Sequence, residues 1–364
     1  MPLADEMLND RVVADLLTAL QAAAPRSGFD ELRRVRLGGL GLRQRADALR
    51  DALLADLPGG YRELEAVVRT ALAGDSFTGW LIWPVSEAAS ARALEDGSPA
   101  AFDAALDLLA DLTPRLTAEF AIRPLLEADL DRALPRVLAW TAHPSEHVRR
   151  LASEGTRPLL PWARRVGAVL ARPGVTLPIL DALHRDPSAY VRRSVANHLN
   201  DLSRARPDLV VEAAGRWSAS ADKPTAQLVR HGLRTLIKQG DPGALALLGF
   251  APPAGITLAD FALSAGSVAV GGELGFSGVL HNTGDSPANL VVDYVVHHRK
   301  ANGTTTPKVF KLTTKTLAPG AALPLERTHS FRLITTRVYH PGQHSLELQV
   351  NGTSLGKADF ELTP

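Results

Sequence analysis

Apolar residues recur at helical spacing through the first 250 residues of the chain. Leu and Ala dominate there, apolar positions fall at i, i+3 and i+4, and Pro or Gly interrupts the pattern about once per helix length. This region therefore predicts a succession of amphipathic helices, of which the clearest span residues 12–23, 44–56, 61–73 and 100–109.

The pattern changes near Gly249. A Pro- and Gly-rich linker at residues 251–257 is followed by short alternating runs, bounded by turn sequences such as Asn302-Gly303 and Pro341-Gly342. About seven short strands in a segment of this length are typical of an immunoglobulin-like β-sandwich, here over residues 258–364. The clearest strands are predicted at residues 275–281, 290–297, 308–315, 329–333 and 345–350.

A repeat lies in the middle of the helical region. Residues 143–150 (HPSEHVRR) align with residues 186–193 (DPSAYVRR), an offset of 43 residues, and a looser third copy begins at Lys223. Pro and Ser suit the first turn of a helix, and the Val is expected to point inward. A period of about 40 residues with two helices per unit is typical of HEAT-like repeats. The predicted fold is therefore a multidomain α + β chain, with an all-α HEAT-like-repeat solenoid over residues 1–250 followed by the sandwich.

Composition narrows the chemistry by exclusion. The chain contains no cysteine, which excludes disulfides, Cys-ligated zinc, iron–sulfur clusters and a Cys nucleophile. No apolar run approaches the roughly 18 residues of a spanning helix, and residues 1–10 are acidic. We therefore expect neither a membrane span nor a secretory signal, and a cytoplasmic location.

The net charge of +1 conceals an uneven distribution. Residues 1–112 carry a net charge of −7, residues 113–250 carry +7, and residues 251–364 carry +1. A basic segment of this kind points to a polyanionic partner, although the arginines could equally decorate solvated helix faces. If the repeated arginines line the concave face of the solenoid, their spacing suits successive backbone phosphates.

One segment matches a zinc-binding pattern. His143, Glu146 and His147 form an H-x-x-E-H sequence, which binds zinc on one helix face in a class of metallopeptidases. Pro144 places the first His at or before the start of the helix, and the second copy of the repeat lacks all three ligand types. These features argue against a metal site, and no phosphate-binding Gly-rich loop is present.

A second segment, residues 151–162, is more unusual. Glu154 falls at the C-terminal end of a helix, where the helix dipole disfavours an anion, and Trp162 follows shortly after. This placement suggests a functional carboxylate beside an aromatic ring. The alternative is a salt bridge from Glu154 to Arg150 or Arg157 together with a core Trp.

Residues 143–162 closely resemble the signature segment of the AlkC-type DNA glycosylases, which belong to the HEAT-like-repeat AlkC/AlkD superfamily. The resemblance extends over most of the chain, including residues 117–124 (TAEFAIRP), and many family members carry a C-terminal immunoglobulin-like domain. One departure is Leu159, at a position that the family often fills with arginine.

The resemblance implies a bacterial, monofunctional glycosylase that removes cationic N3-alkylated bases, such as 3-methyladenine and 3-methylcytosine, by hydrolysis of the N-glycosidic bond. Its partner would be double-stranded DNA containing alkylated bases, and it would act as a monomer without metal or cofactor. Carboxylates would stabilise the positive charge that develops on the deoxyribose and position a water molecule, and aromatic faces would attract the charged base. The implied acidic site residues are Glu119, Glu154 and Asp201, the aromatic wall is Phe120 and Trp162, and the phosphate contacts are Arg149, Arg150, Arg157, Arg192 and Arg193.

Several alternatives remain open at this point. The chain could be a non-catalytic HEAT-repeat scaffold that binds DNA or a protein through its basic face. Trp80 and Trp83, three residues apart beside a Pro, fit a core position better than a DNA contact. The sandwich could clamp DNA through residues 299–315, where Arg299, Lys300, Lys308, Lys311 and Lys315 lie, or it could only brace the repeats.

Overall fold

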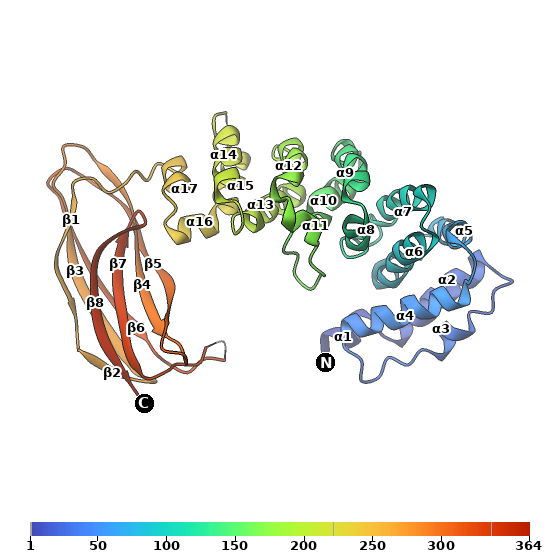
Figure 1. The fold of residues 1–364 in the computed structure, drawn as a ribbon, viewed down its shortest axis with the longest axis horizontal. Coiled ribbons are helices and arrows are strands. Elements are labelled where there is room, and N and C mark those ends of the chain that lie inside the picture. The colour runs from blue at the N-terminus through green and yellow to red at the C-terminus, as the bar shows by residue number, and fades with distance from the viewer. Residues whose placement is uncertain (1, 221, 336) are drawn as a thin grey trace. The chain divides into compact units, whose positions relative to one another are not determined.

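The computed structural model describes residues 2–220, 222–335 and 337–364. The chain forms two compact units, one helical and one built mainly of strands (Figure 1). The helical unit comprises Met1–Ala213 and Ser220–Gly232, and the sandwich unit comprises Ala214–Ala219 and Leu233–Pro364. The predicted fold class, a HEAT-like-repeat helical part followed by an immunoglobulin-like sandwich, is confirmed.

The helices follow one another with short connections. Their bounds are α1 (Pro2–Met7), α2 (Asp10–Ala23), α3 (Asp30–Arg34), α4 (Leu42–Asp56), α5 (Tyr61–Leu72), η1 (Gly79–Leu81), α6 (Ile82–Asp96), α7 (Pro99–Leu112), α8 (Ile122–Ala128), α9 (Leu130–Ala139), η2 (Trp140–Ala142), α10 (Glu146–Gly155), α11 (Gly167–Ala171), η3 (Pro173–Thr176), α12 (Leu177–Leu183), α13 (Ala189–Leu202), α14 (Pro207–Ser218), α15 (Lys223–Gly232), α16 (Arg234–Gln239) and α17 (Pro242–Leu247). The four segments predicted as amphipathic helices correspond to α2, α4, α5 and α7.

Local sequence signals explain where these helices begin and end. Between α6 and α7, Gly97 adopts a left-handed conformation (φ 69°) that closes α6, and Ser98 caps α7 by accepting a hydrogen bond of 3.2 Å from the backbone of Ala101. Pro99 occupies the first helical position, where its missing N–H costs nothing.

The repeat forms one layer of packed helices. Helix α10 packs against α13, and α13 packs against α15, so the three copies of the sequence repeat lie side by side. Val148 and Val191, the matched positions predicted to point inward, are both completely buried. Among the described residues, no helix is long and apolar enough to cross a membrane.

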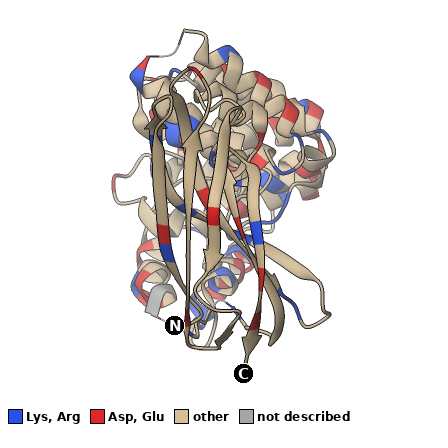
Figure 2. Cartoon of the chain, turned by 90° about the vertical axis from the view of Figure 1, so that its left-hand side faces the viewer, with Lys and Arg blue, Asp and Glu red and all other residues tan. Residues whose placement is uncertain are grey.

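The sandwich unit contains two sheets. One has the order β1-β3-β6 and the other the order β2-β8-β7-β4-β5, with β2 and β8 parallel. Side chains from both sheets, among them Phe276, Tyr294, Leu346 and Phe360, form its core. Figure 2 shows strands of this unit with basic and acidic positions scattered among uncharged ones. The strands are β1 (Ile256–Leu263), β2 (Ser267–Ala269), β3 (Glu273–Asn282), β4 (Ala288–Arg299), β5 (Thr305–Leu317), β6 (Ala322–Ser330), β7 (Gly342–Val350) and β8 (Thr353–Thr363).

One strand of this unit differs from its predicted bounds. The strand predicted at residues 329–333 is instead the end of β6, which begins at Ala322 and stops at Ser330. Leu245 and Phe250, which precede the predicted linker, belong to the same compact unit and pack on Val291 of β4. Gly240 and Gly352 approach so closely that a Cβ on Gly240 would lie 2.6 Å from the Cα of Gly352, which ties the turn after α16 to the β7–β8 turn.

Candidate active site

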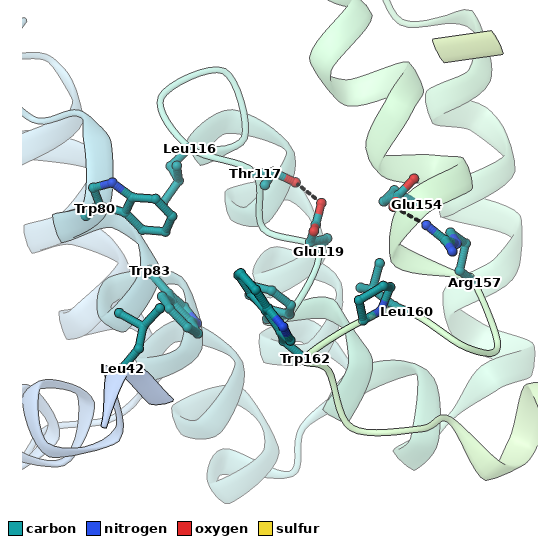
Figure 3. A pocket seen from close by; sticks show the side chains of 12 residues that line it. Leu42, Trp80, Trp83, Leu116, Thr117, Glu119, Glu154, Arg157, Leu160 and Trp162 are labelled. Carbon is teal, nitrogen blue, oxygen red and sulfur yellow. Dashed lines mark hydrogen bonds and ion pairs between the residues drawn. The ribbon is translucent and has the colours of Figure 1, made fainter. Parts of the chain in front are cut away.

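A cavity of about 290 Å³ opens in the helical unit where α4, η1 and α6 face two irregular connections (Figure 3). These are the α7–α8 connection and the connection from Thr156 to Val166 that follows α10. In Figure 3, Trp80 and Trp83 lie on one side of the cavity, Glu154 and Arg157 on the other, and Trp162 between them. The lining residues are Leu42, Trp80, Trp83, Leu116, Thr117, Glu119, Phe120, Glu154, Arg157, Leu160, Pro161 and Trp162.

One wall of the cavity is aromatic. The ring of Trp83 lies 5.0 Å from that of Phe120 and 6.2 Å from that of Trp80, measured between centroids. The indole N–H of Trp83 donates to Glu87 (2.9 Å), and the guanidinium of Arg43 binds the same carboxylate. Trp83 is buried, as the core interpretation requires, but both tryptophans also line the cavity. Their place in the cavity wall could not be predicted from the sequence, because a buried ring and a cavity wall have the same apolar pattern.

Trp162 projects from the connection that follows α10. Its side chain is 72% exposed, and its backbone is left-handed, with φ at 63°. It occupies the third position of a turn closed by a hydrogen bond of 3.3 Å from Ala163 to Leu160, with Pro161 before it. Glycine normally fills this position, and a larger residue there costs about 1–2 kcal/mol. Retention of a Trp at this cost points to a role for its ring at the mouth of the cavity.

Two of the implied acidic residues share one arginine. Arg157 donates from Nη1 to Oε1 of Glu154 at 2.6 Å and from Nε to Oδ2 of Asp201 at 2.8 Å. All three side chains are buried. Burial raises the pKa of Asp201, although the bonds from Arg157 and from the backbone N–H of Leu159 act in the opposite direction.

The third carboxylate joins through a second arginine. Arg150 donates to Oε2 of Glu119, which also accepts a hydrogen bond of 3.0 Å from the hydroxyl of Thr117. Nη2 of Arg150 lies 3.4 Å from Oε1 of Glu154, and its guanidinium stacks 5.0 Å above the ring of Tyr190. Glu119 is thereby connected to Glu154 and, through Arg157, to Asp201.

The complete network contains three carboxylates and two guanidinium groups, so its formal charge is −1. Burial by itself would lower the pKa of Arg157, but its bonds to Asp201 and Glu154 outweigh that effect and raise it, which keeps the guanidinium charged. The positive charges of Arg150 and Arg157 also offset the unfavourable position of the Glu154 carboxylate at the C-terminal end of α10. A net negative charge beside aromatic faces suits a flat, cationic ligand.

The structure assigns different contacts to four of the five predicted phosphate-binding arginines. The guanidinium groups of Arg150 and Arg157 bind the carboxylates of the network. Arg149 donates to the carbonyls of residues 143 and 144, and Arg192 donates to the matched carbonyls of residues 186 and 187. Each of these two arginines therefore secures the turn that precedes its own helix. Arg193 is exposed on α13, and it remains a predicted phosphate contact.

The three residues of the H-x-x-E-H sequence have separate local roles. Nδ1 of His143 accepts from the backbone of Ser145 at 3.0 Å, the His147 ring contacts the edge of Tyr190, and Glu146 accepts from the hydroxyl of Ser188. Within residues 2–220, 222–335 and 337–364, no group of three His, Asp or Glu side chains is arranged to hold a metal ion.

The fold and the site together define a HEAT-like-repeat protein with an acidic, aromatic cavity and a C-terminal immunoglobulin-like sandwich. Its structure is similar to that of Pseudomonas fluorescens alkylpurine DNA glycosylase AlkC bound to DNA containing an abasic site analog, with a TM-score of 0.83, 34% identity and 99% of each chain covered. The uncharacterized protein YhaZ of Bacillus subtilis is 32% identical over 98% of each chain. Residues 257–364 match the family described as the C-terminal Ig-like domain of the uncharacterised protein YhaZ. The chain belongs to the AlkC family of the HEAT-like-repeat AlkC/AlkD superfamily.

Proposed function

We propose that the chain is a DNA glycosylase of alkylation repair that excises cationic N3-alkylated bases, such as 3-methyladenine and 3-methylcytosine, from double-stranded DNA. One observation carries this proposal: a largely buried carboxylate network with a formal charge of −1 lies at the edge of an aromatic cavity. The AlkC neighbour, which is a glycosylase bound to DNA, supports the same activity.

The chemistry requires little from a general acid. An N3-alkylated base is already positively charged, so it leaves readily once positive charge on the deoxyribose is stabilised. Glu154 and Glu119 line the cavity, and their carboxylates would stabilise that charge and hold the attacking water. Asp201 lies behind Arg157, so we assign it a positioning role, in which it fixes the guanidinium that orients Glu154.

Recognition of the lesion would rest on the aromatic residues. The faces of Trp162, Phe120 and Trp83 offer cation–π attraction that a neutral base does not receive at the same strength. Because this attraction depends on the charge of the base, it favours alkylated bases over normal ones. The proposal needs no metal and no cofactor, and a single protein chain suffices.

The test is release of 3-methyladenine from alkylated duplex DNA by the wild-type protein and by Glu154→Gln. We expect wild type to release the base and Glu154→Gln to lose at least about 100-fold in single-turnover rate, because one electrostatic stabiliser is worth 2.7–4 kcal/mol or so. The matched control is Glu146→Gln, an exposed carboxylate on the same helix, which should release base at the wild-type rate. Duplex binding by wild type without base release would contradict the enzyme proposal and favour the non-catalytic scaffold.

A further inference from the structure

Arg123 lies directly beneath the connection that carries Trp162. It belongs to the first turn of α8, its side chain is only 2% exposed, and its guanidinium spans both ends of the connection. Nη1 donates to the carbonyl of Gly155 at 3.1 Å and to that of Arg157 at 2.9 Å, and Nε donates to the carbonyl of Arg164. One side chain thus binds three backbone carbonyls that are up to nine residues apart.

These three carbonyls flank the residues of the candidate site. Gly155 follows Glu154, Arg157 is the partner of Glu154 and Asp201, and Arg164 lies two residues after Trp162. The connection has no regular secondary structure between α10 and α11, so its path depends on side chains that bind its backbone. Arg123 binds the backbone at both ends of it.

The buried guanidinium of Arg123 destabilises the fold. Burial lowers the pKa of Arg123 to about 10, and Nη2 has no hydrogen-bond partner within the described residues. Neutral side chains of similar size would fill the space without that cost, but only a guanidinium offers a planar set of donors that reaches several carbonyls at once. The arginine is therefore explained by the geometry it imposes on the connection.

We propose that Arg123 is a positioning residue for base excision, which rests on the function proposed above. Arg123 follows Glu119 and Phe120 in the same segment, so it couples the half of the site formed by that segment to the half that contains Glu154 and Trp162. Without the three hydrogen bonds of Arg123, the connection would move, and the two halves of the site would no longer hold the same positions relative to each other. A displacement of about 1 Å in such a site can cost on the order of 100-fold in rate.

The experiment compares Arg123→Met and Arg123→Lys with a matched control, Arg92→Met. Arg92 is also a buried arginine that donates to backbone carbonyls, those of Leu54 and Leu57, but it lies away from the cavity. Three quantities are measured at a temperature where every variant is folded: the single-turnover excision rate, the affinity for undamaged duplex, and the rate of tryptic cleavage after Arg164 or Arg165. Both cleavage sites lie in the exposed part of the connection.

We expect both Arg123 variants to lose at least 10-fold in excision rate, to keep duplex affinity within about twofold, and to be cleaved faster at the connection. Arg92→Met should match wild type in all three measurements. The proposal is overturned if Arg123→Met excises at the wild-type rate, or if Arg123→Lys restores that rate, since one ammonium group cannot bind the three carbonyls. If wild type itself releases no base, the proposed function fails, while unchanged tryptic cleavage of the Arg123 variants would separately overturn the positioning of the connection.

Discussion

Nε of Arg157 lies 2.8 Å from Oδ2 of Asp201, which is 44 residues further along the chain. This separation is close to the 43-residue offset of the sequence repeat, so the ion pair joins one repeat to the next. Since Arg157 also binds Glu154, a carboxylate at the cavity is oriented by a residue from the neighbouring repeat. The solenoid is thereby a direct part of the site geometry.

Replacing Asp201 by Asn tests this relationship. The amide can still accept a hydrogen bond from Arg157, but it leaves a buried guanidinium with one carboxylate in place of two, so we expect the free energy of unfolding to fall by about 1–3 kcal/mol. Excision should slow by roughly 10-fold, less than in Glu154→Gln, because Asp201 acts through Arg157. Urea denaturation and single-turnover kinetics provide the two measurements.

The control for that substitution is Asp208→Asn. Asp208 forms an ion pair of 2.6 Å with Arg206, but both side chains are exposed, so solvent screens the pair and it contributes little to stability. Asp208→Asn should therefore leave both the free energy of unfolding and the excision rate close to the wild-type values. Equal effects of the Asp201 and Asp208 substitutions would show that the bond between Arg157 and Asp201 has no special role.

Trp162→Gly should separate backbone strain from function. Glycine adopts a positive φ without penalty, and the Trp side chain is largely exposed, so the substitution relieves strain while losing little buried area. We expect the free energy of unfolding to stay level or rise by up to about 1 kcal/mol, and excision to fall. Trp162→Ala keeps the strain without the ring, so it should lose excision and gain no stability. Wild-type excision by Trp162→Gly would remove this ring from the proposed mechanism.

Four of the residues that line the cavity could be proposed from the sequence, because they fall in two short segments. Glu119 and Phe120 lie in one, Glu154 and Trp162 lie in the other, and the structure brings these segments together around one cavity. The contacts of the arginines could not be predicted in the same way. Whether Arg150 faces solvent or Glu119 depends on the packing of elements 31 residues apart, which local periodicity does not encode.

In the sandwich, strands with strong β-branched patterns were the easiest to predict. Strand β4 was nearly complete in the prediction, because its run of Val residues is bounded by clear turns. Strand β8 was not among the clearest strands of the prediction, since its Gly, Lys and Asp residues resemble a loop and its pairing with β7 determines its conformation. The packing of α17 against β4 was also missed, because the Pro- and Gly-rich linker between them resembles a domain boundary.

Arg193 provides a test of DNA contact. It is exposed on α13, whereas its neighbour Arg192 binds the backbone of the preceding turn. Arg193→Ala should weaken binding to all duplexes to a similar extent and reduce the slope of log K against log salt by about 1, as expected for the loss of one phosphate contact. Arg192→Ala should lower stability and leave that slope unchanged. Fluorescence anisotropy over a salt series measures both, and identical slopes for wild type and Arg193→Ala would contradict the assignment.

The sandwich unit contains three buried histidines with an expected effect on its acid stability. The ring of His298 lies 5.8 Å from that of His344 and 6.2 Å from that of His329. Burial, reinforced by the charge of Arg337, lowers the pKa of His298 to about 3 and that of His329 to about 4, and burial also lowers the pKa of His344. All three rings are therefore neutral in the folded protein at pH 7.

These lowered pKa values predict the sign of the pH dependence. Below pH 6.5 or so, the unfolded chain binds protons that the folded histidines do not bind, so the free energy of unfolding falls as the pH falls toward about 4. Well below pH 6.5, each histidine that stays neutral in the folded protein adds up to about 1.4 kcal/mol per pH unit to the slope of the unfolding free energy against pH.

His298→Phe removes one such group, so the unfolding temperature of the variant should fall less steeply than that of wild type between pH 6.5 and pH 4. At pH 7.5 the variant should be at least as stable as wild type, because neither ring nitrogen of His298 has a hydrogen-bond partner within the described residues and its neighbours Phe331 and Tyr339 are aromatic. Differential scanning calorimetry of the full chain at pH 7.5 and at several values from pH 6.5 to pH 4 measures these unfolding temperatures. If the unfolding temperature falls equally steeply with pH in wild type and variant, His298 is not among the groups that make the unit sensitive to acid.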